Sequence, residues 1–98
     1  MTTTASEAEA ETLAQAIVQA RLAACVQVQA IKSFYIWQDA PCATPEWLLL
    51  IKTRAAQYPA LEVFIREHHS YEVPEIVQLP ITAGAADYLG WVAAQTRD

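Results

Sequence analysis

The fold of this chain depends first on the stretch CVQVQAIKSFYIW, which runs from Cys25 to Trp37. Its first half alternates apolar residues with glutamines, a period of two that is typical of a strand with one buried face. The alternation slips at Ile31 and Lys32, and strong β-formers then continue from Phe34 to Trp37. The sequence therefore predicts one long strand that carries a bend or a bulge.

A helical pattern precedes this strand. Ser6 and Glu9 have the spacing of a capping box, and apolar residues then recur at helical intervals as far as Leu22. The pattern predicts a helix from about Ser6 to Ala24. Only the residues from Met1 to Ala5 precede it, which leaves room for a short first strand at most.

The residues after Trp37 predict a loop, a strand and a helix. Asp39 to Glu46 contains two prolines and is expected to be a loop. Trp47 to Thr53 is apolar at successive positions, as in a strand that is buried on both faces. Pro59 suits the first turn of a second helix, whose apolar stripe continues to His68.

Two further elements complete the chain. Pro74 favours an extended residue before it, and Glu75 to Leu79 is expected to form a fourth strand that ends at Pro80. Gly84 interrupts the chain, and Ala86 to about Thr96 predicts a last helix.

This order of elements predicts an α+β fold in a single domain, residues 1–98. Four strands separated by two helices give the ferredoxin-like βαββαβ sandwich, here with an extra C-terminal helix. The second strand would lie at an edge of the sheet, where a long aromatic strand is prone to pair with another chain. Since 54% of the residues are hydrophobic, we expect self-association through strands.

Composition excludes several classes of protein. The net charge is −5 and the six cationic side chains are scattered, so we expect no nucleic-acid partner. No apolar run approaches the ~20 residues of a membrane span, and the first residues lack the features of a signal peptide. We therefore expect a cytoplasmic protein in which Cys25 and Cys42 stay reduced.

Enzyme motifs are also absent. The chain has no phosphate-binding loop, no zinc-protease motif and no nucleophile elbow. It contains no Asn, so an acylphosphatase-like enzyme of this fold would lack one of its catalytic residues. The residues alone therefore give no positive sign of an enzyme, and an enzyme of ferredoxin-like fold stays the third and weakest alternative.

Potential metal ligands cluster only in the run HHSYEVPEI, which spans His68 to Ile76. Imidazoles with nearby carboxylates suit Cu(II), Zn(II) or Ni(II), and copper binds tightest in the usual affinity order. Adjacent residues of a helix point about 100° apart, so His68 and His69 would need the irregular backbone of a helix end, or ligands from another subunit. The alternative is that both histidines end a helix and pack against it.

The other candidates also have two interpretations. Glu72 and Glu75 could form an acid–base pair or be solvated loop charges. The tryptophans could stack on a ligand or pack in a core or an interface; they are Trp37, Trp47 and Trp91.

Five segments together resemble the CutA family of divalent-cation tolerance proteins. They are LAACV at residues 22–26, SFYIW at 33–37, LLLIKT at 48–53, HSYEVPEI at 69–76, and the stretch from Gly84 to Trp91. They occur in order and with family-like spacing, and the resemblance extends from about Thr2 to Thr96.

The resemblance implies a ferredoxin-like subunit in a tight homotrimer whose architecture is similar to that of the PII signalling proteins. It implies tolerance of divalent cations, copper especially, without enzymatic turnover. The family's double histidine corresponds to His68 and His69, which are therefore the expected metal ligands. The alternative function is a PII-like signalling or scaffold trimer that binds a small anion or a partner protein in its inter-subunit clefts.

Three positions depart from the family pattern. The strand-1 cysteine that serves as a copper ligand in bacterial members corresponds to Thr2. The family's Trp-Glu-Gly-Lys turn is replaced by WQDA at residues 37–40, so a different turn is expected. Family members also carry several apolar residues before the threonine at the start of this chain, so we expect a shortened first strand.

Overall fold

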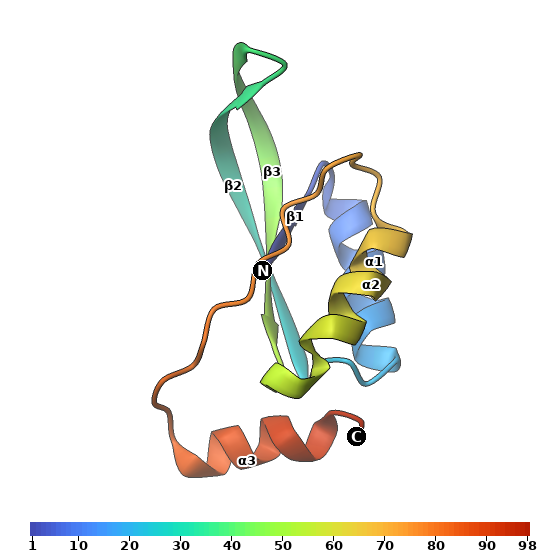
Figure 1. Ribbon diagram of the computed structural model, residues 1–98, viewed down its shortest axis with the longest axis vertical. Helices are drawn as coiled ribbons and strands as arrows, with labels where there is room; N and C mark the ends of the chain where they lie inside the picture. Colours follow the sequence, from blue (N-terminus) through green and yellow to red (C-terminus); the bar gives the residue numbers. More distant parts are fainter.

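A three-stranded antiparallel sheet with two helices against one face forms most of the molecule (Figure 1). The computed structural model describes residues 1–98. The strands have the spatial order β1-β3-β2. Along the chain the elements are β1 (Thr2–Thr4), α1 (Glu7–Gln19), β2 (Cys25–Trp37), β3 (Ala40–Lys52), the 3-10 turn η1 (Ala55–Gln57), α2 (Tyr58–His68) and α3 (Ala86–Gln95).

Strands β2 and β3 form one uninterrupted hairpin, so the expected bulge and the expected loop from Asp39 to Glu46 were both wrong. Their pairing is continuous from Cys25 opposite Lys52 to Trp37 opposite Ala40. Gln38 and Asp39 have φ angles of 50° and 64°, and positive φ at both central residues is the geometry of a tight two-residue hairpin turn.

The prolines of β3 are tolerated because the strand is partly an edge. On its other side β3 pairs with β1 only from Trp47 to Leu49. At Pro41 and Pro45 that side therefore has no neighbouring strand, and a missing N–H directed toward it removes no ladder hydrogen bond.

Helix α1 begins where the capping box predicts it and ends earlier than expected. The Ser6 hydroxyl accepts a hydrogen bond from the Glu9 N–H at 3.1 Å. The helix ends at Gln19 rather than near Ala24 because Arg21 takes a left-handed conformation with a φ of 57°. Such a residue commonly ends a helix.

The hydrophobic core is small and lies between the two helices and the sheet. It consists of eight buried residues: Ala10, Leu13, Ile17, Leu22, Ala23, Leu49, Leu61 and Ile65. Figure 1 shows that the free end of the β2–β3 hairpin extends well beyond these helices. Helices therefore cover one end of the sheet, and no helix covers the other end.

The expected fourth strand from Glu75 to Leu79 does not form in the single chain. Ile76 makes an isolated antiparallel bridge with Thr2, and the Val77 N–H donates to the Met1 carbonyl at 3.2 Å. The residues 78–84 make no backbone–backbone hydrogen bond. Because β1 has only three residues, it offers too few partners for a longer strand.

Candidate functional site

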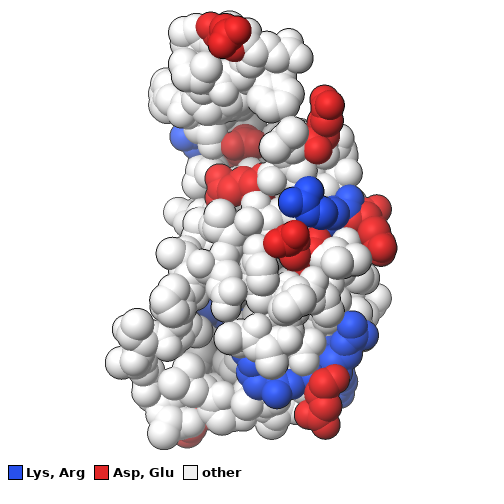
Figure 2. All heavy atoms as spheres, in the orientation of Figure 1, with Lys and Arg blue, Asp and Glu red and all other residues white.

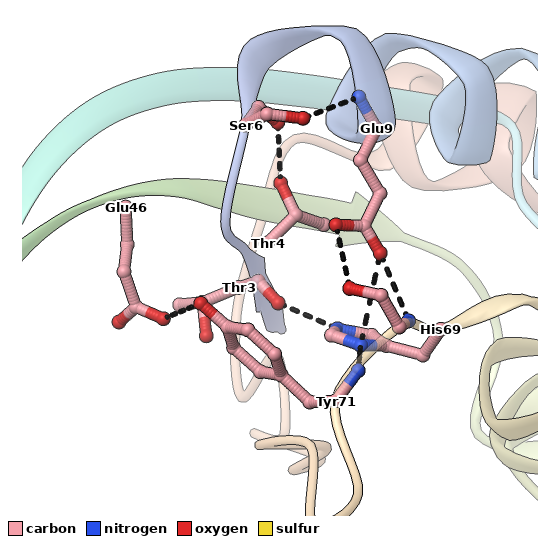
Figure 3. A network of polar contacts seen from close by, with 8 residues as sticks. Thr3, Thr4, Ser6, Glu9, Glu46, His69 and Tyr71 are labelled. Atoms are coloured by element: carbon pink, nitrogen blue, oxygen red, sulfur yellow. Dashed lines mark hydrogen bonds and ion pairs between the residues drawn. The ribbon is translucent and has the colours of Figure 1, made fainter.

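His69 is held in a buried hydrogen-bond network at the end of α2 (Figure 3). Its side chain has no exposed surface. Its Nε2 lies 2.6 Å from the Thr3 carbonyl oxygen, and its Nδ1 accepts the Tyr71 N–H at 3.0 Å. This pattern fits the neutral ring with its proton on Nε2, so both nitrogens are occupied.

Glu9 connects the same loop to the first turn of α1. Its two carboxylate oxygens accept the Ser70 N–H and the Ser70 hydroxyl, each at 3.0 Å. One of these oxygens also lies 3.9 Å from the His69 Nδ1. The loop that follows α2 is therefore fixed from two sides, by β1 through Thr3 and by α1 through Glu9.

His68 has a different environment from its neighbour. It is the last residue of α2, and its Nδ1 lies 2.7 Å from the Phe64 carbonyl oxygen. The ring stacks on Phe64 with 4.1 Å between the centroids. The residue is exposed and its Nε2 makes no protein hydrogen bond, which leaves this atom open to a ligand.

The two histidines therefore fit a metal ion unequally. A metal bound to His69 would have to displace the Thr3 carbonyl or the Tyr71 N–H, whereas His68 offers a free nitrogen. No group of three or more His, Cys, Asp and Glu residues is arranged to hold a metal ion. The chain thus presents one imidazole with a free nitrogen and no preformed set of metal ligands.

A cleft of about 600 Å³ lies between the β2–β3 hairpin and the loop after α2. At its base the Tyr71 hydroxyl donates to a Glu46 carboxylate oxygen at 2.7 Å. Burial, and then the hydrogen bond and charge of Glu46, raise the pKa of Tyr71 above its ordinary value. The cleft is lined by Thr3, Ser33, Phe34, Tyr35, Trp37, Glu46, Ser70, Tyr71, Glu72, Val73 and Glu75.

Sequence reasoning missed Glu46 because it assigned this residue to a loop. The positive φ angles at Gln38 and Asp39 belong to a two-residue turn, and such a turn places Glu46 opposite Ile31 in the hairpin. The pair Gln38-Asp39 was the only available signal, and it is weaker than the usual Asn-Gly or Asp-Gly.

The remaining candidates lie apart from one another. Glu72, Glu75 and Trp37 line the cleft, whereas Trp47 packs against the core. Trp91 lies on α3, is 44% exposed and contacts Tyr88. Thr2, at the position of the family's cysteine, is fully buried, and the two cysteines, Cys25 and Cys42, are free thiols.

Fold and site together define a small antiparallel α+β protein with a half-covered sheet, a buried histidine network and an acidic, aromatic cleft. A family model described as "CutA1 divalent ion tolerance protein" matches residues 1–95. The chain belongs to this family.

Three relatives illustrate the similarity. The chain is 44% identical over 95 residues to the divalent-cation tolerance protein CutA of Thermus thermophilus, covering 96% of this chain and 92% of that protein. The solved Thermus structure superposes with a TM-score of 0.94 at 42% identity, over 98% of this chain and 94% of that one. A CutA from Archaeoglobus fulgidus, described as periplasmic, superposes with a TM-score of 0.94 at 33% identity, over 96% and 92% of the two chains.

The third relative is human Protein CutA, which is 41% identical over 92 residues. The match covers 93% of this chain and 51% of the human protein, so the chain spans about half of that relative's length. Within this chain, no helix is both long enough and apolar enough to span a membrane.

Proposed function

We propose that the chain is a non-enzymatic divalent-cation tolerance protein that acts as a homotrimer, with Cu(II) as the cation that it binds. Membership of the CutA1 family supports the tolerance role. The observation that carries the assembly is the large apolar surface that a single protomer leaves open. Only 15 of the 98 residues are buried, and thirteen large hydrophobic side chains are exposed.

The bare edge of β2 supports pairing between copies. β2 has thirteen residues and pairs with β3 alone, so its outer edge has no partner. Phe34 and Ile36 near its end are 75% and 68% exposed. An unprotected apolar edge of this length favours strand addition by another chain, which would satisfy the backbone and bury the side chains together.

A ferredoxin-like subunit with PII-like assembly is part of the proposal. The Thr2–Ile76 bridge puts the C-terminal segment beside β1, at the position that a fourth strand occupies in that fold. Leu79 and Ile81 in this segment are 63% and 51% exposed. We propose that the segment becomes a strand when another copy supplies the missing partner.

Copper would bind at the end of α2, where His68 and His69 lie. The open Nε2 of His68 is the first ligand in this proposal, and His69 joins only if it gives up a hydrogen bond. Neutral imidazole binds Cu(II) well, and a proton competes with the metal for the same ring nitrogen, so binding should weaken in acid.

Isothermal titration with Cu(II) tests this proposal on the wild type and on two single variants. His68→Ala should abolish binding without changing the fold. His69→Ala should retain copper binding at temperatures where it is folded, because His68 is unchanged. Equal copper affinity of the wild type and His68→Ala would contradict the assignment.

The alternative of an anion-binding PII-like trimer has less support in this chain. Glu46, Glu72 and Glu75 line the cleft between the hairpin and the loop after α2, and no Lys, Arg or His lines it. Carboxylates repel an anion at close range. A thermal-shift screen of small anions would favour this alternative if one of them raised the melting temperature.

A cytoplasmic location completes the proposal. Cys25 and Cys42 are unpaired, as is usual in a reducing compartment. The Archaeoglobus relative is described as periplasmic, so cell fractionation should be carried out in the organism that carries this chain. Recovery in the cytoplasmic fraction is the expected result.

A further inference from the structure

The register of the β2–β3 hairpin decides which of its side chains share the face that borders the cleft. Ser33 lies opposite Thr44, and Ile31 lies opposite Glu46. Because side chains alternate along a strand, Ser33, Tyr35 and Trp37 share a face with Glu46. The Tyr35 hydroxyl lies 3.2 Å from the Thr44 hydroxyl, which agrees with this arrangement.

Glu46 places on this face a carboxyl group that has no cationic partner in the chain. The residue is only 8% exposed and takes part in no ion pair. Glu46 lines the cleft; one of its carboxylate oxygens accepts the Tyr71 hydroxyl, and the other makes no hydrogen bond within the chain. A cationic group placed in the cleft would therefore find a carboxylate that no Lys, Arg or His of the chain already pairs with.

The charged side chains near Glu46 do not supply the missing cationic partner. The alternation places the Lys32 side chain on the other face of the hairpin; its ammonium lies 5.6 Å from the ring centroid of Phe34, a residue that also lines the cleft, and makes no ion pair with Glu46. Glu72 and Glu75 add negative charge to the cleft, and Glu75 lies near the N-terminal ammonium. Figure 2 shows acidic atoms where the projecting hairpin meets the rest of the molecule.

The geometry distinguishes between two kinds of cation. A metal ion needs several ligands converging on one point, and no such group of His, Cys, Asp and Glu exists in the chain. The cleft is instead roomy, at about 600 Å³, and is bordered by the rings of Tyr35, Trp37 and Tyr71. Aromatic rings with one buried carboxylate suit an ammonium or guanidinium group on an apolar body.

We propose that this cleft binds a small organic cation, a primary ammonium or guanidinium on a flat apolar body. Glu46 is its counter-ion, and Tyr35 and Trp37 contact its apolar part. The open Glu46 oxygen accepts the hydrogen bond from the cationic group, while Tyr71 fixes the other oxygen. This site is separate from the copper proposal because it uses neither His68 nor His69.

Three phenyl compounds of similar size but different charge test, on the wild-type protein, whether the cleft prefers a cation. They are 2-phenylethylamine, which is a cation at pH 7, neutral 2-phenylethanol, and the anion phenylacetate. Isothermal titration should show binding of the amine about tenfold to a hundredfold tighter than the alcohol, since a hydrogen bond to a charged group has that effect. Phenylacetate should not bind.

Variants locate the site. Glu46→Gln keeps an acceptor for Tyr71 but removes the charge, and should weaken amine binding by about tenfold or more. Ser33→Lys supplies an internal ammonium to Glu46 and should block the amine. Glu67→Gln on the exposed surface of α2 is the matched control and should bind as the wild type does, as should His68→Ala.

Two results would overturn the proposal. One is equal affinity for the amine and the alcohol, which would show that charge is not recognised. The other is no amine binding to folded wild-type protein, which would show that the cleft is filled within the assembly. Both outcomes are independent of whether copper binds.

Discussion

The helix-covered half of the sheet and the projecting half of the β2–β3 hairpin have almost opposite surroundings. Ile17 on α1 has no exposed surface, whereas Ile36 near the hairpin turn is 68% exposed. Both residues belong to elements with ordered backbone hydrogen bonds. The difference between the halves is therefore in side-chain packing and not in secondary structure.

This contrast shows that the hydrophobic core of a single chain packs against only one end of the sheet. The helices α1 and α2 cover the sheet near β1, and no element of the same chain covers the hairpin's far end. Small domains bury a modest fraction of their surface, and this one leaves Phe34, Ile36 and Leu79 in solvent. The projecting half is complete only if other copies cover it.

The largest expected effect comes from a matched pair of isoleucines. Ile17→Ala removes fully buried atoms and should lower the free energy of unfolding by about 2–5 kcal/mol. Ile36→Ala should cost only a few tenths of a kcal/mol in a separated protomer, but it should weaken assembly. Urea unfolding at two protein concentrations measures both effects.

The concentration dependence is the informative part of that experiment. The midpoint of an assembled protein rises with protein concentration, and Ile36→Ala should reduce this rise while Ile17→Ala leaves it in place. If the two variants behaved alike at every concentration, the contrast between the halves would be wrong.

The adjacent histidines should differ next most strongly. His69→Ala leaves the Thr3 carbonyl and the Tyr71 N–H without partners and should cost about 2–3 kcal/mol. His68→Ala removes an exposed ring with one hydrogen bond and should cost less than about 1 kcal/mol. Chemical unfolding of the two variants measures the difference, and a larger loss for His68→Ala would contradict the environments described for the two rings.

Tyr71 joins the two halves, and its titration should be visible at high pH. The pKa of its hydroxyl is raised by burial and by Glu46, whereas the unfolded chain loses this proton near pH 10. Above about pH 10 the folded chain therefore holds more protons than the unfolded chain, so stability falls as the pH rises.

Tyr71→Phe removes this titration. The free energy of unfolding of this variant should fall less steeply between about pH 9.5 and 11 than that of the wild type. Tyr88→Phe on α3, where the ring is 43% exposed, is the control and should keep the wild-type slope. Identical slopes for all three proteins would show that Tyr71 does not titrate as proposed.

The smallest expected effect is a gain in stability at Thr2. Its hydroxyl is buried and has no hydrogen-bond partner, so Thr2→Val should raise the free energy of unfolding by about 1 kcal/mol. Thr4→Val is the matched control, because the Thr4 hydroxyl donates to the Ser6 carbonyl at 2.9 Å. That variant should lose stability, and two losses in a thermal melt would refute the prediction.

Sequence patterns located the helices well because helices depend on local information. The capping box at Ser6, the apolar stripe of α2 and the break at Gly84 placed all three helices to within a few residues, apart from the end of α1 at Gln19. That end depends on the left-handed backbone of Arg21. A long polar side chain gives no signal for this conformation.

The strands were harder because pairing is not local. Pro41 and Pro45 predicted a loop, but the short β1 leaves their side of β3 unpaired, and sequence does not show that. The segment from Glu75 to Leu79 has the composition of a strand, yet in one chain it finds only the bridge to Thr2. Composition indicates a tendency to form a strand but does not supply the partner.

The sequence proposed His68 and His69 as metal ligands, and this assignment stays a prediction. The sequence does not distinguish the two rings. In the structure both ring nitrogens of His69 have hydrogen-bond partners, on Thr3 and Tyr71, whereas His68 has a partner only at Nδ1, the Phe64 carbonyl. Glu46 was missed because its role depends on the hairpin register. When the role of a residue depends on a partner far away in the sequence, the neighbouring residues do not indicate that role.

The most direct test of the account is the mass of the protein in solution. Light scattering coupled to gel filtration should give three times the chain mass of 10.8 kDa at micromolar concentration. The double variant Phe34→Asp/Ile36→Asp should shift this mass toward that of a single chain while circular dichroism retains the helices. A wild-type protein that remains a folded monomer would contradict the claim that the projecting half is completed by other copies.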